Sequence, residues 1–571
     1  MISKGLVLDL KNLSDHNIEQ YGLIVDNIRD DFNSLIENVS LDNKSPYWLL
    51  SSIVSREPEY SPLFLRCCNL ELIKFNITNN SSLEKIVIYD KQLFLLVKKY
   101  TNSKRPSIKV EYKNESKIPF FYSFLYIKNC VRSFCFVILT LVAKLLSKKK
   151  TYNKKSSLIL ISTHILKDSS QEFTKENYID RYYLNLYSYL DKTIEDNVVF
   201  VPGFPGGPQS YLKLFKKLKL SDISFLLKGD ILHLSDYLYA FFSSSKVLLL
   251  KTPKTFFRGV EVTSLIRSEL RFFTFDYKII EAFLNYRFVY RLSKDKLDIA
   301  MFIDCYENHL SSKGFMLGFN KFMPNVRTIG YQGIIDSAAC KINLHPTVFE
   351  RLSMLTPKRF FVIGEGLIDH LKEFDNKINV FAGPAFRYNY LWGKRQLSKD
   401  LKVFNILITL PISFSETNSI LDLLNTTLKL LSTNFSIKVR VKCHPTYNPS
   451  KIKKLIHIND SRIEYVDESF IDYIYDSSLL ISGASTTCIE AMSIGVPVVV
   501  TGSKLGVMNI SIPNSVPTDL YRIITNDNDL AKYICSLVGR KNNYYSNKLL
   551  REKYFKRADK ASVASLFTLQ S

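Results

Sequence analysis

The feature that most constrains this 571-residue chain is a repeated alternation of short apolar runs with amphipathic stretches. A first series of strand-like runs occupies 156–163, 197–205, 246–250, 297–303, 327–332, 359–364 and 378–383. A second series occupies 404–411, 437–445, 462–466, 478–483 and 496–502. Helices are expected between them, for example at 170–194 and 415–434. Such alternation is typical of parallel, doubly wound sheets, so we predict an α/β protein with two Rossmann-like domains.

The polar linker at 389–400 separates the two series and sets the predicted domain boundary. We assign 1–390 to an N-terminal, acceptor-side domain and 391–571 to a C-terminal, nucleotide-binding domain. Two runs in the first hundred residues, 85–90 and 91–100, look strand-like, but their topology stays open. The tail at 547–567 is predicted to be helical and basic.

One segment, 118–155, has the composition of a membrane-associating element. Its longest uncharged run covers 11 residues, Ser133 to Ala143, well short of the roughly 20 that a spanning helix needs. Six lysines follow between Lys144 and Lys155, and such clusters are attracted to anionic headgroups. We predict an interfacial helix with a basic edge. A buried core helix followed by a solvated loop is the alternative, and a transmembrane anchor is disfavoured.

Charge and cysteine usage narrow the class of protein further. The formal net charge is +23, which favours an anionic partner. Nine cysteines are scattered without a CxxC pair, as expected for reduced, buried thiols. The first residues lack the apolar core of a signal peptide. We therefore expect a cytoplasmic protein, peripheral to the inner face of the membrane. No signature of nucleic-acid recognition is present, and nucleic acid is not an expected partner.

The most informative motif runs from Ser478 to Gly502, where an apolar strand leads through Gly483 into Ser485, Thr486 and Thr487. These hydroxyl residues would begin a helix, whose free N–H groups and dipole favour a phosphate. Glu490, one turn later, can accept hydrogen bonds from ribose hydroxyls. Ordinary N-capping, with Glu490 completing a capping box, explains the same pattern without a ligand.

A second motif is the pair His444–Pro445 at the end of the strand 437–445. Doubly wound sheets bind ligands at the carboxyl ends of their strands. An imidazole placed there can donate to a phosphate oxygen and neutralise charge on a leaving group. The sequence predicts that His444 and the hydroxyls of 485–487 act on one donor phosphate.

The His-Pro pair and the Ser/Thr loop resemble the HP and S motifs of bacterial sialyltransferases, polysialyltransferases and related capsule enzymes. The string from Glu490 to Val499 is similar to a nucleotide-binding signature of GT-B glycosyltransferases. The resemblance implies a GT-B fold, two Rossmann-like domains facing a cleft, and a nucleotide-sugar donor, first of all a CMP-activated acidic sugar. It implies no metal and no other cofactor.

Residues 299–335 resemble surface-carbohydrate biosynthesis proteins that carry Y-E-N and G-Y-Q-H-G motifs. Here they read Tyr306-Glu307-Asn308 and Gly330-Tyr331-Gln332-Gly333, without the histidine of the second motif. This places Asn308, Tyr331 and Gln332 on the acceptor side of the cleft.

Glu307 is the predicted general base, because an inverting transfer needs a carboxylate to take the proton of the acceptor hydroxyl. Asp304 and Glu365 are rival carboxylates, and Glu365 is also placed in the cleft. Arg387 is predicted to bind the donor's phosphate or carboxylate, with an interdomain salt bridge as its alternative role.

The sequence thus predicts a glycosyltransferase of capsule, O-antigen or similar surface polysaccharide, acting on a glycan or lipid-linked acceptor. A UDP- or GDP-sugar transferase is one alternative. A CDP-alditol polyol-phosphate transferase of the teichoic-acid type is another, although such enzymes use a further histidine that this chain lacks. A non-catalytic basic scaffold is the least favoured alternative.

Overall fold

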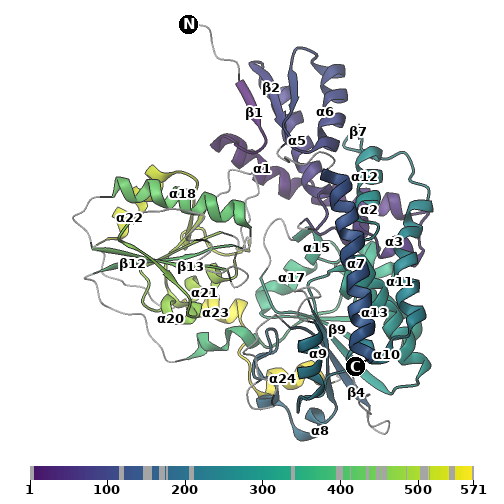
Figure 1. Cartoon of the computed structure of the whole chain (residues 1–571). Helices are drawn as coiled ribbons and strands as arrows, with labels where there is room; N and C mark the ends of the chain where they lie inside the picture. Colours follow the sequence, from purple (N-terminus) through teal and green to yellow (C-terminus); the bar gives the residue numbers. More distant parts are fainter. Residues whose placement is uncertain are drawn as a thin grey trace.

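The computed structural model of the chain is shown in Figure 1. Its strands and helices form two parallel six-stranded sheets, a small parallel sheet near the N-terminus and a two-stranded hairpin. The structure describes residues 6–58, 60–114, 121–145, 157–165, 174, 178–204, 211–335, 341–393, 403–411, 413–431, 436–444, 452, 460–483, 485–501, 512–513, 515–538 and 547–568.

The first six-stranded sheet has the order β11-β10-β9-β8-β4-β5, with every neighbouring pair parallel. The chain therefore reverses its direction of growth between β4 and β8, and this topological switch point is where such sheets bind ligands. The strands are β4 (Leu158–His164), β5 (Val198–Gly203), β8 (Ile299–Cys305), β9 (Arg327–Gln332), β10 (Arg359–Val362) and β11 (Val380–Ala382).

Two long helices, α13 (Tyr277–Lys294) and α14 (Leu310–Phe322), pack closely against each other beside this sheet. Gly314 permits the approach, because an added Cβ there would lie 2.2 Å from the carbonyl oxygen of Ala282. Phe302 of β8 stacks on Phe319 of α14 with their ring centroids 4.6 Å apart, which packs the helix pair against this strand.

The second six-stranded sheet has the order β14-β13-β12-β15-β16-β17, again all parallel. Numbered along the chain this is 3-2-1-4-5-6, the Rossmann order, with its switch point between β12 and β15. The strands are β12 (Phe404–Thr409), β13 (Ile437–Lys442), β14 (Ile463–Val466), β15 (Leu479–Ser482), β16 (Val498–Thr501) and β17 (Tyr521–Ile524). The prediction of two doubly wound α/β domains is confirmed.

The N-terminal residues form a parallel three-stranded sheet of β1 (Leu6–Asp9), β2 (Leu83–Ile88) and β3 (Lys109–Tyr112). The strand expected at 85–90 is confirmed as β2. The strand expected at 91–100 is wrong, because this run forms α6 (Lys91–Lys104). Asp90 caps that helix by accepting from the N–H of Leu93 at 2.8 Å.

Two further expectations are corrected. The strand expected at 246–250 is instead the end of α11 (Leu234–Lys246) and the 3-10 helix η3 (Val247–Leu249). The long helix expected at 170–194 does not form over 178–194, where the structure has η1 (Leu186–Tyr189) and α8 (Lys192–Glu195). The reason is local: Asp180 accepts from two nearby N–H groups, and Asn185 takes a left-handed φ of 57°.

The membrane-associating segment contains one continuous helix, α7 (Phe121–Leu145), which runs along the surface in front of α12 and α13 (Figure 1). Among the described residues, no helix is both long enough and apolar enough to cross a bilayer. The predicted lysine cluster lies almost entirely at 146–155, outside the described residues.

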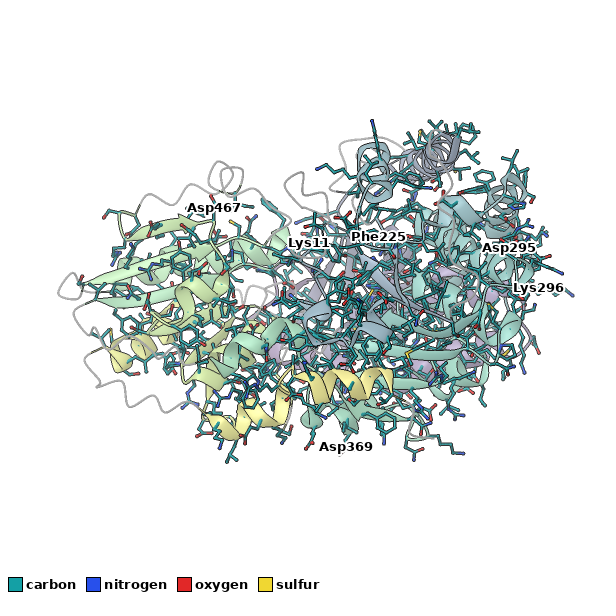
Figure 2. All side chains as sticks on the ribbon, turned by 90° about the horizontal axis from the view of Figure 1, so that it is seen from below. Lys11, Phe225, Asp295, Lys296, Asp369 and Asp467 are labelled. Carbon is teal, nitrogen blue, oxygen red and sulfur yellow. The ribbon has the colours of Figure 1, made fainter. Side chains whose placement is uncertain are left out.

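The C-terminal tail forms two helices, α23 (Lys548–Tyr554) and α24 (Lys560–Phe567), and crosses from the second sheet to the first (Figure 2). Between them the backbone of Lys556 bonds to both Ile363 and Ala385. The helices contribute Tyr554, Val563 and Phe567 to a hydrophobic core that also contains residues of both large sheets. The predicted boundary at 390/391 stays a prediction, because the tail joins the two halves.

Candidate functional site

The hydroxyl residues after β15 gather at the switch point of the second sheet. Thr409, the last residue of β12, donates to Ser482 at 2.7 Å, and its hydroxyl oxygen lies 3.4 Å from that of Thr487. Thr487 begins helix α21 (Thr487–Ile494) and donates to the hydroxyl of Ser485 at 2.8 Å. Ser485, Thr486 and Thr487 are all partly exposed. Gly483, just before them, is buried.

The same loop contacts the other domain. The Thr486 hydroxyl donates to the carbonyl oxygen of Ile335 and accepts from its N–H, both at 3.3 Å. Ile335 follows the carboxyl end of β9, so the carboxyl edges of the two sheets face each other here. Thr486, the N-cap residue, makes no side-chain cap because its hydroxyl bonds across the domains, while the Ser485 hydroxyl accepts from the Thr487 N–H at 3.3 Å. The capping box expected with Glu490 does not form, because this carboxyl group accepts from Tyr390 instead.

Glu490 is buried on α21 and accepts a hydrogen bond from the phenol of Tyr390. Burial raises its pKa to about 7, although Tyr390 and Arg387 oppose the rise. The carboxyl group is therefore poised between its neutral and ionised forms near neutral pH. A hydrogen-bonding partner that favours the carboxylate, such as a ribose hydroxyl, would shift that balance.

His444 is half-buried just after β13. Burial lowers its pKa, and the positive charge of Arg181 from the first domain lowers it further. Strand β12 lies between β13 and β15, so two strand spacings, about 10 Å, separate His444 from the hydroxyl loop. A nucleotide phosphate chain can span such a gap. Pro445, the other half of the motif, lies outside the described residues.

Arg387 lies between charged groups of both domains. Its guanidinium is 5.6 Å from the ring centroid of Tyr388. Tyr388 raises the pKa of Arg387 most, burial opposes the rise, and Glu490 and Glu307 add to it. The described residues record no ion pair for this guanidinium, so the predicted salt bridge is not present in the described structure. Its charge remains available for an anionic group.

Glu307 follows β8, at the switch point of the first sheet. Its carboxylate accepts from Tyr182 at 2.9 Å and pairs with the His309 ring at 2.9 Å. Burial alone would raise its pKa, but His309, with His164 and Tyr182, lowers the pKa to about 2. A group with so low a pKa is a weak proton acceptor at neutral pH.

His309 is locked between two carboxylates. Its Nδ1 lies 3.2 Å from Glu57, which in turn accepts from Lys278 at 2.9 Å. Burial disfavours the charged ring, but Glu57 and Glu307 outweigh it and raise the pKa of His309 to about 10. Glu307 is thus one end of a charged chain that reaches into the N-terminal helices.

His164, the last residue of β4, is a residue that the sequence analysis passed over. Its ring centroid lies 6.0 Å from that of Tyr182, whose hydroxyl binds Glu307. Its Nδ1 is buried without a hydrogen-bond partner among the described residues. Burial lowers the pKa of this imidazole, and the negative charge of Glu307 opposes the shift. Only the strand order brings β4 beside β8, which is why a lone histidine in the sequence gave no signal.

Two of the predicted acceptor-side residues are buried. Asn308 takes a left-handed φ of 51° and donates to the carbonyl oxygen of Asn343 at 2.6 Å. Tyr331 donates to the carbonyl oxygen of Pro384 at 2.7 Å and packs on Tyr183. Both side chains bond to neighbouring backbone carbonyls, and their place on the acceptor side stays a prediction.

Of the remaining predicted residues, Gln332 and Asp304 are buried and Glu365 is exposed. The Oε1 of Gln332 is buried without a donor among the described residues, at the end of β9. Asp304 is buried, accepts from Ser162 at 2.7 Å and has a pKa raised by burial. Glu365 is exposed, and the glycine before it packs on the backbone of Tyr554 in the tail.

No protein-family model and no curated protein sequence matches the chain. Among solved structures, it is similar to the UDP co-structure of MnaA from S. aureus, with 12% identity and a TM-score of 0.42 over 72% of this chain and 95% of that one. It is also similar to the lipopolysaccharide outer core galactosyltransferase WaaB, with 11% identity and a TM-score of 0.39 over 72% of this chain and 98% of that one. A glycosyltransferase from Rickettsia africae ESF-5 has 13% identity to this chain and a TM-score of 0.38 over 73% of this chain and 97% of that one. These TM-scores lie below 0.5, so the likenesses carry no argument about activity.

The chain's own strand orders define its class. It is an α/β protein with two Rossmann-like sheets whose carboxyl edges meet through Thr486 and Ile335, which is the GT-B arrangement.

Proposed function

We propose that this protein is a glycosyltransferase of surface-polysaccharide biosynthesis. The observation that carries the proposal is the pairing of two switch points. The hydroxyl loop and Glu490 stand at one, and Glu307 and His164 stand at the other. The negative charges of Glu490 and Glu307 both help to raise the pKa of Arg387, which therefore lies within electrostatic reach of each switch point. Such a pairing suits a reaction between an activated donor on one domain and an acceptor on the other.

The donor is proposed to be a nucleotide sugar, in the first place a CMP-activated acidic sugar. The hydroxyls of 485–487 and the start of α21 would hold its phosphate, with His444 donating a hydrogen bond from the end of β13, two strands away. Arg387 would contact the phosphate or the sugar's carboxylate. Leaving-group charge is then stabilised by protein groups, and no metal is proposed to take part.

The acceptor hydroxyl needs a base, and the charges around Glu307 refine its predicted role. His309 holds Glu307 ionised with a pKa of about 2, whereas burial lowers the pKa of His164, and its Nδ1 has no hydrogen-bond partner among the described residues. We propose that His164 accepts the proton and that Glu307 stabilises the resulting imidazolium. Glu307 as the direct base, the role predicted from the sequence, is the competing assignment.

Binding and turnover test this proposal in two steps. A thermal-shift screen of CMP, CDP, UDP and GDP comes first, because a ligand that binds only the folded state raises Tm. We expect CMP to give the largest shift, and His444→Ala and Thr487→Ala to abolish it. A larger shift with UDP or GDP would replace the donor assignment. No shift with any nucleotide would overturn the function.

Hydrolysis of CMP-, CDP-alditol-, UDP- and GDP-activated donors, followed with and without EDTA, then measures turnover. We expect His164→Gln and Glu307→Gln each to lower kcat by about 100-fold or more while leaving the CMP shift intact. Turnover in wild type should fall as pH drops below the His164 pKa. If His164→Gln retains turnover and Glu307→Gln does not, Glu307 is the base.

The acceptor is proposed to be a glycan or a lipid-linked glycan, and the protein is proposed to work at the inner face of the cell membrane. The surface helix α7 and the net charge of +23 support this location.

A further inference from the structure

Helix α7 presents a continuous apolar face to solvent. Ile127, Val131, Phe134 and Ile138 are between 41% and 60% exposed, and Leu145 continues the series. At 100° per residue these five side chains fall within an arc of about 60° on the helix. Core-facing helices of soluble proteins turn such a stripe inward.

The opposite face of α7 is turned inward and contains buried polar side chains. Ser133 and Thr140 are buried, and the Ser133 hydroxyl donates to the carbonyl oxygen of Phe275 at 2.6 Å. The helix is therefore attached to the protein by an orientation that leaves its apolar stripe outside. Repacking the stripe into the core would break this attachment.

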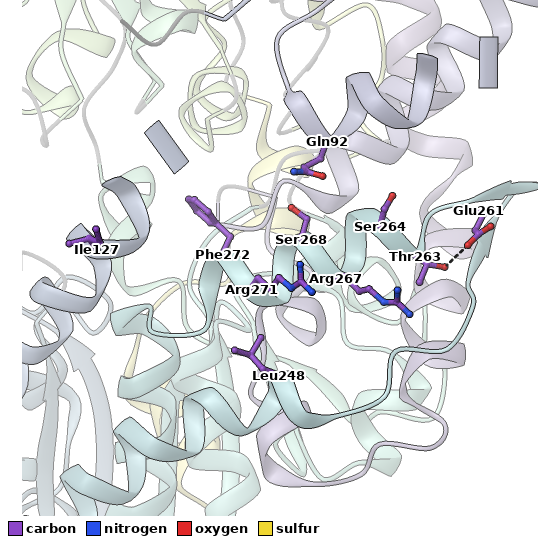
Figure 3. A pocket seen from close by; sticks show the side chains of 10 residues that line it. All are labelled: Gln92, Ile127, Leu248, Glu261, Thr263, Ser264, Arg267, Ser268, Arg271 and Phe272. Carbon is purple, nitrogen blue, oxygen red and sulfur yellow. Dashed lines mark hydrogen bonds between the residues drawn. The ribbon is translucent and has the colours of Figure 1, made fainter. Parts of the chain in front are cut away.

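The stripe ends in a hollow of about 960 Å³ between α7, α12 (Thr263–Phe273), η3 and α6 (Figure 3). Ile127, Leu248 and Phe272 supply its apolar lining. Arg267 and Arg271, one turn apart on α12, are exposed and supply its positive charge.

These arginines are not neutralised by neighbours. Arg267 donates to the carbonyl oxygen of Thr252 at 3.4 Å, and the described part of the chain records no acidic partner for Arg267 or Arg271. Glu261, an acid of the same lining, lies 3.7 Å from Lys254. The hollow thus combines two available guanidinium groups with apolar walls, which is the chemistry that takes a phosphate attached to hydrocarbon chains.

We infer that α7 and this hollow form a docking surface for an anionic phospholipid membrane. The α7 stripe enters the acyl boundary, and Arg267 and Arg271 bind one lipid phosphate in the hollow. Charge complementarity selects this occupant over a second copy of the chain, since a chain of net charge +23 repels itself and is attracted to an anionic surface. The inference gives the proposed membrane location a surface and a lipid class, and it does not depend on the transfer reaction.

Vesicle co-sedimentation of the full chain tests the surface, using phosphatidylcholine alone and a 70:30 mixture with phosphatidylglycerol. We expect wild type to bind the anionic vesicles in a salt-dependent way. Arg267→Gln with Arg271→Gln should weaken that binding about 30-fold, because each basic residue near such a surface adds about a factor of five. Val131→Ser with Phe134→Ser should remove binding to both vesicle types.

Matched controls separate the surface from general charge and hydrophobicity. Lys532→Gln with Lys548→Gln removes two exposed charges from the other domain, and Leu430→Ser with Leu549→Ser removes two exposed apolar side chains there. These controls should bind vesicles as wild type does. Equal losses in controls and test variants would overturn the assignment to α7 and the hollow.

Three other outcomes would also overturn it. Unchanged vesicle binding by the arginine variant would remove the headgroup site. A thermal shift with inorganic phosphate that needs both arginines, without vesicle binding, would make the ligand a soluble phosphate. A dimer in light scattering that Phe134→Ser separates into monomers, again without vesicle binding, would make the stripe a self-association face. The CMP shift is measured on every variant, so a failed docking surface is distinguishable from a failed transferase.

Discussion

Glu490 carries a carboxyl group whose ionisation opposes folding. Its pKa rises from 4.5 in the reference state to about 7 in the folded protein. A raised folded-state pKa means that its contribution to stability is present below pH 4.5 and is lost as pH rises through about 7. Glu490→Gln keeps an acceptor for Tyr390 without a charge.

We therefore expect Glu490→Gln to match wild type at pH 5 and to be more stable at pH 8, on the order of 2–3 kcal/mol. Melting curves at the two pH values measure the difference, with the exposed Glu365→Gln as the control. A variant less stable than wild type at pH 8 would show that the carboxylate is stabilised in the fold.

In contrast to Glu490, whose surroundings favour the neutral form, His309 is a base whose surroundings favour the charged form. Its folded pKa of about 10 lies above the usual 6.5, so its contribution is full below pH 6.5 and lost as pH rises through about 10. His309→Gln should lower Tm most at pH 6, and the deficit should shrink towards pH 10. The exposed His16→Gln is the matched control for a histidine substitution outside this charged chain. A deficit independent of pH would mean that His309 acts only by packing.

Among single residues, the sequence predicted correctly those site residues that belong to one local motif. The hydroxyls of 485–487 and Glu490 were predicted from the strand–loop–helix pattern, and all lie at one switch point. His164 and Tyr182 were missed because they join Glu307 only through the strand order, across about 120 to 140 residues of chain. The left-handed backbone of Asn308, whose amide donates to the carbonyl oxygen of Asn343, had no signal in the sequence.

At the scale of elements, periodicity found every strand of the first large sheet and all of the second except β17. That edge strand was missed because only Ile524 of its four residues is buried, so it lacks a buried apolar run. It failed where runs of similar composition belong to helices: 91–100 begins α6, and 246–250 spans the end of α11 and η3. At 91–100 the helix is set by its N-cap, because the Asp90 side chain accepts from the N–H of Leu93. At 246–250 the chain passes directly from α11 into η3, with no turn residue between Lys246 and Val247 to begin a strand. Composition alone does not contain that information.

Gly364, just after β10, shows how one residue determines where helix α23 of the tail packs. An added Cβ at Gly364 would lie 2.3 Å from the backbone of Tyr554, so α23 seats only against a glycine. We expect Gly364→Ala to cost about 1–3 kcal/mol and to make the segment around Lys556 sensitive to trypsin. Gly229→Ala is the matched control, because its nearest neighbour would be a side-chain atom at 3.5 Å. Equal protease resistance in both variants would contradict this account of the tail.

For the whole molecule, the C-terminal tail joins the two large sheets through one shared hydrophobic core. One hydrophobic cluster contains Ile303 from the first sheet, Leu480 from the second, and Phe555 and Leu566 from the tail. The far side of the second sheet has a separate core that includes Leu421. A domain boundary drawn at a polar linker does not reveal this arrangement, because the residues that close it lie at the end of the chain.

The consequence is a difference in the number of thermal transitions rather than in Tm alone. Phe555 is fully buried, and Phe555→Ala should cost about 3–5 kcal/mol. Since the lost contacts join the two sheets, we expect calorimetry to resolve one transition in wild type and two in this variant. Leu421→Ala, a comparable loss inside the separate core, should lower Tm without adding a transition. Two transitions already present in wild type would mean that the domains unfold independently, and that the tail holds them in contact without coupling their stability.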